Sequence, residues 1–339
     1  MSRGMWQRAA TAVAVIGILL TAAATLVFGT YDITLDRVWQ TLTGGGSPMD
    51  RQIILEQRLP RLLAALVVGA GLGAAGAVFQ TLSRNPLGSP DILGFTTGSA
   101  TGALIVSLVL PGMRSGEAGA EAGGLGIGVG AVLGGFLTAA VVLLLARREA
   151  SVGSRLILAG IAIAALLSSV NDYLLTSADL EEAESAKTWL YGSLNALRWP
   201  DLTGPGPAIL LLLFALLLGQ RQLRMLELGE DMAGGLGVPV RRTSRVLMML
   251  AVGITAAAIA VAGPIGFLAL AAPQLAHRWW RTAGLTVGTS ALLGAGILAV
   301  ADFLAARLLS PFEIPVGLVT GALGGVYLLW LLHRERERL

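Results

Sequence analysis

Residues 62–80 read LLAALVVGAGLGAAGAVFQ, a run in which only the last position is polar. About twenty such residues in a helix cross ~30 Å of hydrocarbon at 1.5 Å per residue. Gly71 to Gly76 also match G-x-G-x-x-G, but that fingerprint indicates a dinucleotide site only between a strand and a helix. Within an apolar run, Gly69 and Gly73 form G-x-x-x-G, which lets two helices approach closely. The stretch therefore predicts a tightly packed transmembrane helix.

Nine more apolar runs surround this one, and together they account for most of a 339-residue chain that is 55% hydrophobic and only 13% charged. Soluble domains carry about 25% charged residues, and no hydrophilic stretch here is long enough to form one. We expect an all-α polytopic membrane protein with one transmembrane domain over residues 1–339 and ten helices. Their ranges are about 9–28, 62–80, 92–111, 123–146, 155–175, 203–220, 244–262, 265–280, 284–305 and 315–333.

Basic residues predict the orientation of these helices. With the N-terminus inside, 16 of the 24 Lys and Arg residues lie on the inner side, Arg147, Arg148 and Arg338 among them, as the positive-inside rule expects. Both termini are then cytoplasmic, and the first run is a retained helix rather than a signal peptide. Outer loops are expected at about 29–61, with an amphipathic stretch at 35–42, and at about 176–202. A long inner loop is expected at about 221–243.

Several function classes are disfavoured by composition. The chain has no cysteine, two histidines and one lysine, Lys187, which is not preceded by a Walker A glycine loop. It lacks an H-E-x-x-H zinc pattern as well, so we expect no bound cofactor or metal and no ATP hydrolysis by this chain. The basic residues are scattered between apolar runs, which indicates charge at membrane edges rather than a nucleic-acid surface.

Asp302 is the most notable charge near a membrane segment. A carboxylate there can belong to a proton pathway, or it can form a structural pair. Arg307 follows five residues later, so we expect Asp302 to pair with Arg307 near the outer end of its helix. The competing function, a proton- or sodium-driven secondary transporter, predicts several carboxylates at mid-membrane depth and inverted repeats. Neither feature is clear in the sequence.

Two short polar segments flank the run at 62–80. Arg58-Leu59-Pro60-Arg61 precedes it on the outer side, where the arginines can anchor the helix at the interface or contact acidic groups of a soluble partner. RNPLGSPD at residues 84–91 follows it on the inner side. Its two prolines predict a rigid turn, and Asp91 can cap the next helix.

The inner loop contains its own short helix signal. Glu230 and Asp231 follow Gly229, as acids do at helix starts, and the apolar residues Leu228, Met232 and Leu236 recur every four positions. Such a stripe either docks on a partner protein or packs against the membrane domain of the same chain.

Together these stretches resemble the FecCD family of ATP-binding-cassette (ABC) importer permeases, which move iron–siderophore complexes, haem and cobalamin. The resemblance spans nearly the whole chain, and one departure is Pro273-Gln274, where most relatives carry Pro-His. Segments 88–91, 226–231 and 323–330 are most similar to permeases of the ferric-enterobactin type. The matching stretches are 58–61, 84–91, 156–160, 189–194, 228–237, 263–267 and 314–317.

The resemblance implies the type II ABC importer (BtuC-like) permease fold with ten helices, in the cell (inner or plasma) membrane. It implies a second permease subunit, more often a different chain than an identical one, and two ATPase subunits that use ATP and Mg. An extracytoplasmic binding protein and a ferric siderophore, catecholate before hydroxamate, haem or cobalamin, complete the set of partners. We expect alternating access without covalent chemistry.

The resemblance also assigns site residues. Docking of the binding protein is expected at Arg58, Arg61 and Arg307, and the inner mouth of the pore at Asn85 and Leu87. Coupling to the ATPase is expected at Leu228, Gly229, Glu230, Asp231, Met232, Ala233, Leu236 and Gly237.

Overall fold

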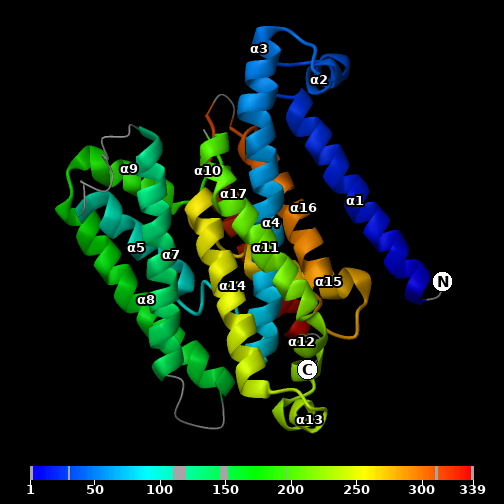
Figure 1. The fold of residues 1–339 in the computed structure, drawn as a ribbon, viewed down its shortest axis with the longest axis vertical. Coiled ribbons are helices and arrows are strands. Elements are labelled where there is room, and N and C mark those ends of the chain that lie inside the picture. Colours follow the sequence, from blue (N-terminus) through cyan, green and yellow to red (C-terminus); the bar gives the residue numbers. More distant parts are fainter. Residues whose placement is uncertain are drawn as a thin grey trace.

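The structure, a computed structural model, describes residues 3–29, 31–109, 120–145, 152–195, 197–309 and 312–336. Within these residues the chain is helical apart from turns, loops and one bridge pair between Leu309 and Phe312 (Figure 1). The expected all-α class is confirmed. Arg147, Arg148 and Arg338, three of the basic residues expected on the inner side, lie outside the described residues.

Each of the ten expected apolar ranges coincides with a helix. These helices are α1 (Arg3–Val27), α4 (Leu59–Ser83), α5 (Phe95–Leu104), α7 (Ala120–Leu145), α8 (Val152–Ser177), α11 (Pro205–Leu218), α14 (Val240–Ala262), α15 (Leu268–Trp280), α16 (Val287–Ala305) and α17 (Val316–Arg336). In the described part of the chain, seven helical stretches are long and apolar enough to span a membrane. Helix α5 with η2, and the apolar part of α17, are shorter, and α15 has only 13 residues. Ten crossings therefore remain a prediction.

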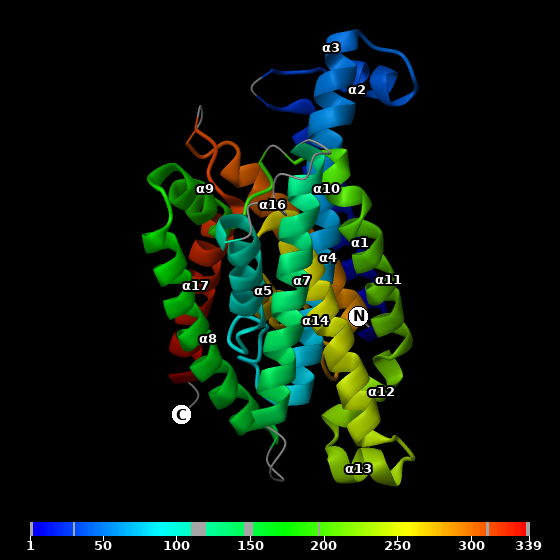
Figure 2. The same cartoon turned by 60° about the vertical axis from the view of Figure 1, so that its left-hand side comes forward.

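The short elements gather at the two ends of the bundle. The amphipathic stretch expected at 35–42 forms helix α2, and α2 and α3 crown the end that we call outer (Figures 1 and 2). Helix α13 occupies the opposite, inner end, and α1 begins and α17 ends on that same half. The short elements are α2 (Leu35–Leu42), α3 (Pro48–Arg51), η1 (Gln52–Arg58), η2 (Ile105–Val109), α9 (Leu180–Leu190), α10 (Trp199–Thr203), α12 (Gln220–Glu227) and α13 (Glu230–Gly235).

Helix α4 is the centre of the fold and packs against α16, α14, α15 and α11. A Cβ atom on Gly69 would lie 2.5 Å from the carbonyl oxygen of Gly294, and one on Gly73 would overlap that of Ser290. The α4 and α16 backbones therefore touch, because each presents small residues four positions apart. The G-x-G-x-x-G pattern is a packing motif, as the sequence predicts.

At its outer end α4 continues without a break into η1, whose hydrogen bonds are π-helical, and α3, so that one helical rod runs from Pro48 to Ser83. These 36 residues span about 54 Å, more than the ~30 Å hydrocarbon core of a membrane. The rod carries the outer hairpin, in which Arg37 pairs with Asp50 at 2.6 Å and Val38 packs with Ile54.

Three of the stretches that carry the family resemblance meet at one backbone junction. The amide of Ser193 donates to the carbonyl of Ala262 at 2.8 Å, and the amide of Gly317 donates to that of Gly192 at 3.0 Å. Gly192 has φ +68°, a left-handed conformation that side chains disfavour. Glycine at this position lets the loop after α9 bridge the end of α14 and the start of α17.

Candidate functional site

The outer end of the bundle contains a cavity of about 540 Å³ between the end of α1, the η1–α4 rod and the end of α16. We call it the arginine cavity. Its charged lining consists of Arg58, Arg61, Arg198, Arg307, Asp302 and Glu313. All three arginines expected to dock a binding protein therefore lie in one place, although they come from distant parts of the sequence.

Arg61 is held by carboxylates of this same chain. Its Nε and Nη2 atoms donate to both carboxylate oxygens of Asp302 at 2.9 and 3.0 Å, and Nη1 donates to Glu313 at 3.1 Å. The Arg61 side chain is 15% exposed and that of Asp302 is 3% exposed. A bidentate pair of this kind fixes both side chains.

The expected pair of Asp302 with Arg307 is wrong, because the partner of Asp302 is Arg61. The close contact of α4 with α16 brings Arg61 onto Asp302. Arg307 follows the end of α16 instead, and its guanidinium stacks 4.1 Å from the ring centre of Phe303 and donates to the carbonyl of Phe28.

Arg58 and Arg307 both bind the C-terminal end of α1. Arg58 donates to the carbonyls of Leu26 at 2.6 Å and Val27 at 3.0 Å, and also to that of Tyr31. The last carbonyls of a helix lack intrahelical partners and attract cations. In this structure the three arginines are therefore positioned by internal acceptors, neutral ones for Arg58 and Arg307 and charged ones for Arg61.

At the inner end, α13 presents an apolar surface to solvent. Leu228, Met232 and Leu236 are 63%, 64% and 58% exposed, whereas Ala233, on the other side of the helix, is fully buried. Gly229 (φ +113°) precedes the helix, which begins at Glu230 as expected. The stripe faces away from the rest of the chain, which favours a partner protein over packing on its own membrane domain.

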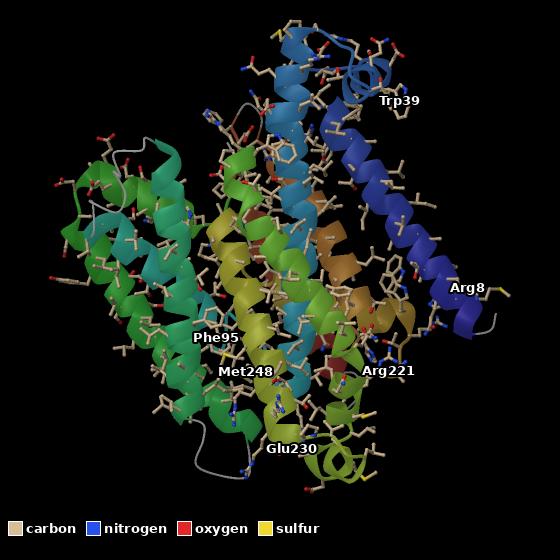
Figure 3. The ribbon with its side chains drawn as sticks, in the orientation of Figure 1. Arg8, Trp39, Phe95, Arg221, Glu230 and Met248 are labelled. Carbon is tan, nitrogen blue, oxygen red and sulfur yellow. The ribbon has the colours of Figure 1, made fainter. Side chains whose placement is uncertain are left out.

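Asn85 and Leu87, expected at the inner mouth of the pore, lie in the turn that follows α4. The Asn85 side chain accepts from the amide of Leu87 at 2.9 Å, and the Leu87 side chain is exposed. Arg84 reaches toward Glu230 of α13 at 3.8 Å (Figure 3 labels Glu230). The turn at the end of α4 therefore borders α13.

Asp91 does not cap α5, contrary to the expectation from sequence. Helix α5 begins at Phe95 after Gly94, which has a left-handed conformation. The Asp91 carboxylate instead accepts from the Thr96 hydroxyl at 2.7 Å and from the amide of Phe267 at 3.2 Å. It therefore links the turn before α5 to the loop before α15, a contact that sequence spacing alone does not reveal.

The departure at Pro273-Gln274 has a structural partner. Proline inside α15 removes a backbone donor, and the buried Gln80 of α4 donates to the carbonyl of Leu270 at 2.9 Å, within the turn that Pro273 interrupts. Gln274 donates to the Oε1 atom of Gln80 at 2.7 Å and so orients it. The two glutamines connect α4 to the irregular turn of α15.

Some site residues were not predicted from the sequence. Glu313 and Arg198 line the arginine cavity, but each lies in a loop or at a helix end far along the chain from Arg58. The one available signal was their charge at the edge of an apolar segment. Among the described residues, no cluster of three His, Cys, Asp or Glu side chains could hold a metal ion.

The sequence matches the FecCD transport family over residues 15–334. The chain belongs to this family. It is 42% identical over 327 residues to the ferric enterobactin transport system permease protein FepG of Escherichia coli (strain K12), covering 94% of this chain and 96% of that protein. It is 36% identical to the hemin transport system permease protein HmuU of Yersinia pestis, covering 95% of this chain and 94% of that one.

A solved structure, of a metal-chelate type ABC transporter in an inward-facing conformation, superimposes with a TM-score of 0.81. It is 29% identical, and the match covers 96% of this chain and 98% of the other. FecCD proteins are permease subunits of ABC transporters and are not catalytic on their own. This FecCD chain is therefore a multi-pass membrane permease.

Proposed function

We propose that the chain is a permease subunit of an ABC importer for ferric siderophores, with a catecholate siderophore as the substrate. The observation that carries this proposal is the 42% identity to FepG over nearly the full length of both chains. The chelator retains its iron during transport, so the permease needs no metal ligands. The path needs only weak contacts, since tight binding of the chelate would slow its release.

The importer would contain a second permease, a different chain rather than a copy, and two ATPases that bind ATP and Mg. The exposed stripe on α13 supports an ATPase docking site formed by residues 228–233, 236 and 237, in a coupling loop of about 221–243. Closure of the ATPase dimer on ATP would move α13. The pore would then open in turn to the outer and to the inner side of the membrane. Asn85 and Leu87, which border α13, fit the inner mouth of that pore.

We place the chain in the inner or plasma membrane as a single domain over residues 1–339 with ten crossings and both termini in the cytoplasm. The ten helices that coincide with apolar ranges support this topology. Helix α1 begins and α17 ends on the same half of the molecule, which also supports this topology (Figure 2). The arginine cavity then faces outward, where the extracytoplasmic binding protein would dock against Arg58, Arg61 and Arg307.

The test is uptake into vesicles that contain the complete complex with its binding protein. Uptake of radiolabelled ferric enterobactin should require internal ATP and continue after an ionophore collapses the proton gradient. Ferric hydroxamates and haem serve as alternative substrates in the same vesicles. Uptake that follows the proton gradient would contradict the ABC mechanism, and preference for another chelate would contradict catecholate specificity.

A haem importer is the second candidate, because the chain is 36% identical to the hemin permease HmuU. Haem uptake without siderophore uptake in the same vesicles would support it. Cobalamin is a further family substrate for the same panel. A proton-driven mechanism finds little support, because Asp302, the one carboxylate considered for a relay, is bound by Arg61.

A further inference from the structure

Glu313 lies in the arginine cavity in the segment between α16 and α17, and its side chain is 45% exposed. Its carboxylate accepts from Nη1 of Arg61 at 3.1 Å, while the other two donating nitrogens of Arg61 bind Asp302. Arg61 therefore has two carboxylate partners of different character. Asp302 is buried and bidentate, whereas Glu313 is half exposed and binds through one hydrogen bond.

The difference determines which partner can be exchanged. Separating Asp302 from Arg61 would leave the buried Asp302 carboxylate without its partner, which is strongly unfavourable. The exposed pair with Glu313 is weak, since water and salt screen it. A carboxylate arriving from outside can therefore replace Glu313 on Nη1 without disturbing Asp302.

Glu313 also reduces the positive charge that the cavity presents. Four arginines line the cavity, and Asp302 and Glu313 are its two acidic residues. The excess positive charge attracts a negatively charged partner and raises its rate of association. Glu313 therefore opposes an acidic partner in two ways. It weakens the attraction before contact, and it competes for Arg61 once the partner is bound.

We propose that Glu313 is an internal competitor for Arg61 that sets the affinity of the permease for the acidic docking surface of its binding protein. The inference rests on the proposed function and extends it to a residue that determines affinity. When the binding protein docks, its carboxylate replaces Glu313 on Arg61. When it leaves, Glu313 returns, so that the empty binding protein is released instead of blocking the outer face.

The test uses the complete permease–ATPase complex in lipid nanodiscs and a fluorescently labelled binding protein loaded with ferric enterobactin. Glu313→Gln removes the charge but retains the size of the side chain, and its exposed position makes misfolding a minor concern. We expect the dissociation constant to fall about three- to tenfold, mainly through faster association at low salt. The empty binding protein should also dissociate more slowly.

Glu56→Gln is the matched control. Glu56 is an exposed carboxylate on the rod that carries Arg61, and it does not line the cavity. An unchanged or weaker affinity of the Glu313→Gln complex would overturn the inference while leaving docking intact. An equal gain from Glu56→Gln would overturn it too, because general surface charge would then explain the effect. If the wild-type complex binds no binding protein, the proposed docking fails and the inference fails with it.

Discussion

The arginine cavity at the outer end and the apolar stripe at the inner end of this permease present opposite chemistry. At the outer end four arginines line one cavity, and Arg58, Arg61 and Arg307 are all bound by acceptors of the same chain. At the inner end three large apolar side chains of a helix of only six residues, and of the positions that flank it, stand more than half exposed. Arg58, Arg61 and Arg307 have their hydrogen-bond acceptors without a partner protein, whereas the apolar stripe of α13 is left uncovered by the described part of the chain.

The comparison indicates how long each partner stays. An internally paired polar surface is stable in water and can bind and release a partner with little net change in its hydrogen bonds. An exposed apolar stripe is unfavourable in water until a partner covers it. A transient partner therefore suits the outer end, and a permanent one suits the inner end. Four experiments test this difference.

The largest effect is expected from replacing Leu228, Met232 and Leu236 together with Ser. In the proposed ATPase docking site each side chain would lose its contacts with the partner, and truncation of interface anchors costs about 2 kcal/mol or more each. The ATPase should then fail to copurify. The control is the equally apolar, exposed set Leu35, Trp39 and Leu42 on α2, whose replacement with Ser should leave copurification unchanged. Intact copurification of the first variant would show that the stripe faces something else.

The second prediction concerns the buried ion pair of the arginine cavity. Asp302→Asn leaves the Arg61 charge without its buried partner, and we expect a loss of about 3 kcal/mol in the free energy of unfolding. Unfolding in detergent, followed by tryptophan fluorescence, measures it. Adding Arg61→Gln should recover most of the loss, because no buried unpaired charge remains and Glu313, which loses its partner, is half exposed. Full stability of Asp302→Asn with abolished uptake would instead indicate a proton-carrying role.

The third prediction tests attraction at the outer end. Arg58→Glu with Arg307→Glu should slow association of the binding protein about tenfold at low salt and leave ATPase assembly intact. We choose Arg307 rather than Arg61 because reversing Arg61 would place like charges beside Asp302. Arg242→Glu, an exposed arginine of the inner end, is the control. Equal association rates for the double variant and the wild type would remove the docking role.

The smallest effect concerns the outer hairpin above the cavity. The hydrogen bond from Arg37 holds the pKa of Asp50 below its usual value of 3.8. A carboxyl group with a lowered pKa in the folded state stabilises that state above its usual pKa, and the contribution disappears as the pH falls through the lowered value. Amide hydrogen exchange in α2, corrected for intrinsic rates, should therefore accelerate below about pH 3.8. Asp50→Asn should show similar acceleration at neutral pH.

Local sequence patterns predicted much of the fold. The ten apolar ranges each contain a helix, α13 begins at the glycine–acid step of residues 229–231, and the small residues of α4 pack as expected. These features depend on residues within a few turns of one another. Apolar length alone does not decide the crossings, because α15 is only 13 residues long and includes Pro273.

The pairing at the candidate sites could not be predicted. Arg61 and Asp302 are 241 positions apart, and only the packing of α4 on α16 brings them together. The sequence therefore favoured Arg307, the basic neighbour nearest to Asp302 along the chain. Asp91 gave the same kind of error, because the amide of Phe267 that it binds belongs to a distant loop.

The rod from Pro48 to Ser83 would make the two ends of the permease mechanically dependent. It carries Arg58 and Arg61 in its outer half, and it ends beside the turn of Arg84, which faces Glu230. If the rod moves as a rigid body, a pivot of about 5° at its inner tip shifts Arg61, about 33 Å away along the rod, sideways by roughly 3 Å. A small displacement of α13 would thus become a shift of about the length of a hydrogen bond at the arginine cavity. The shape of the arginine cavity would then change through movement of the rod as a whole, without a chain of side-chain rearrangements between the two ends.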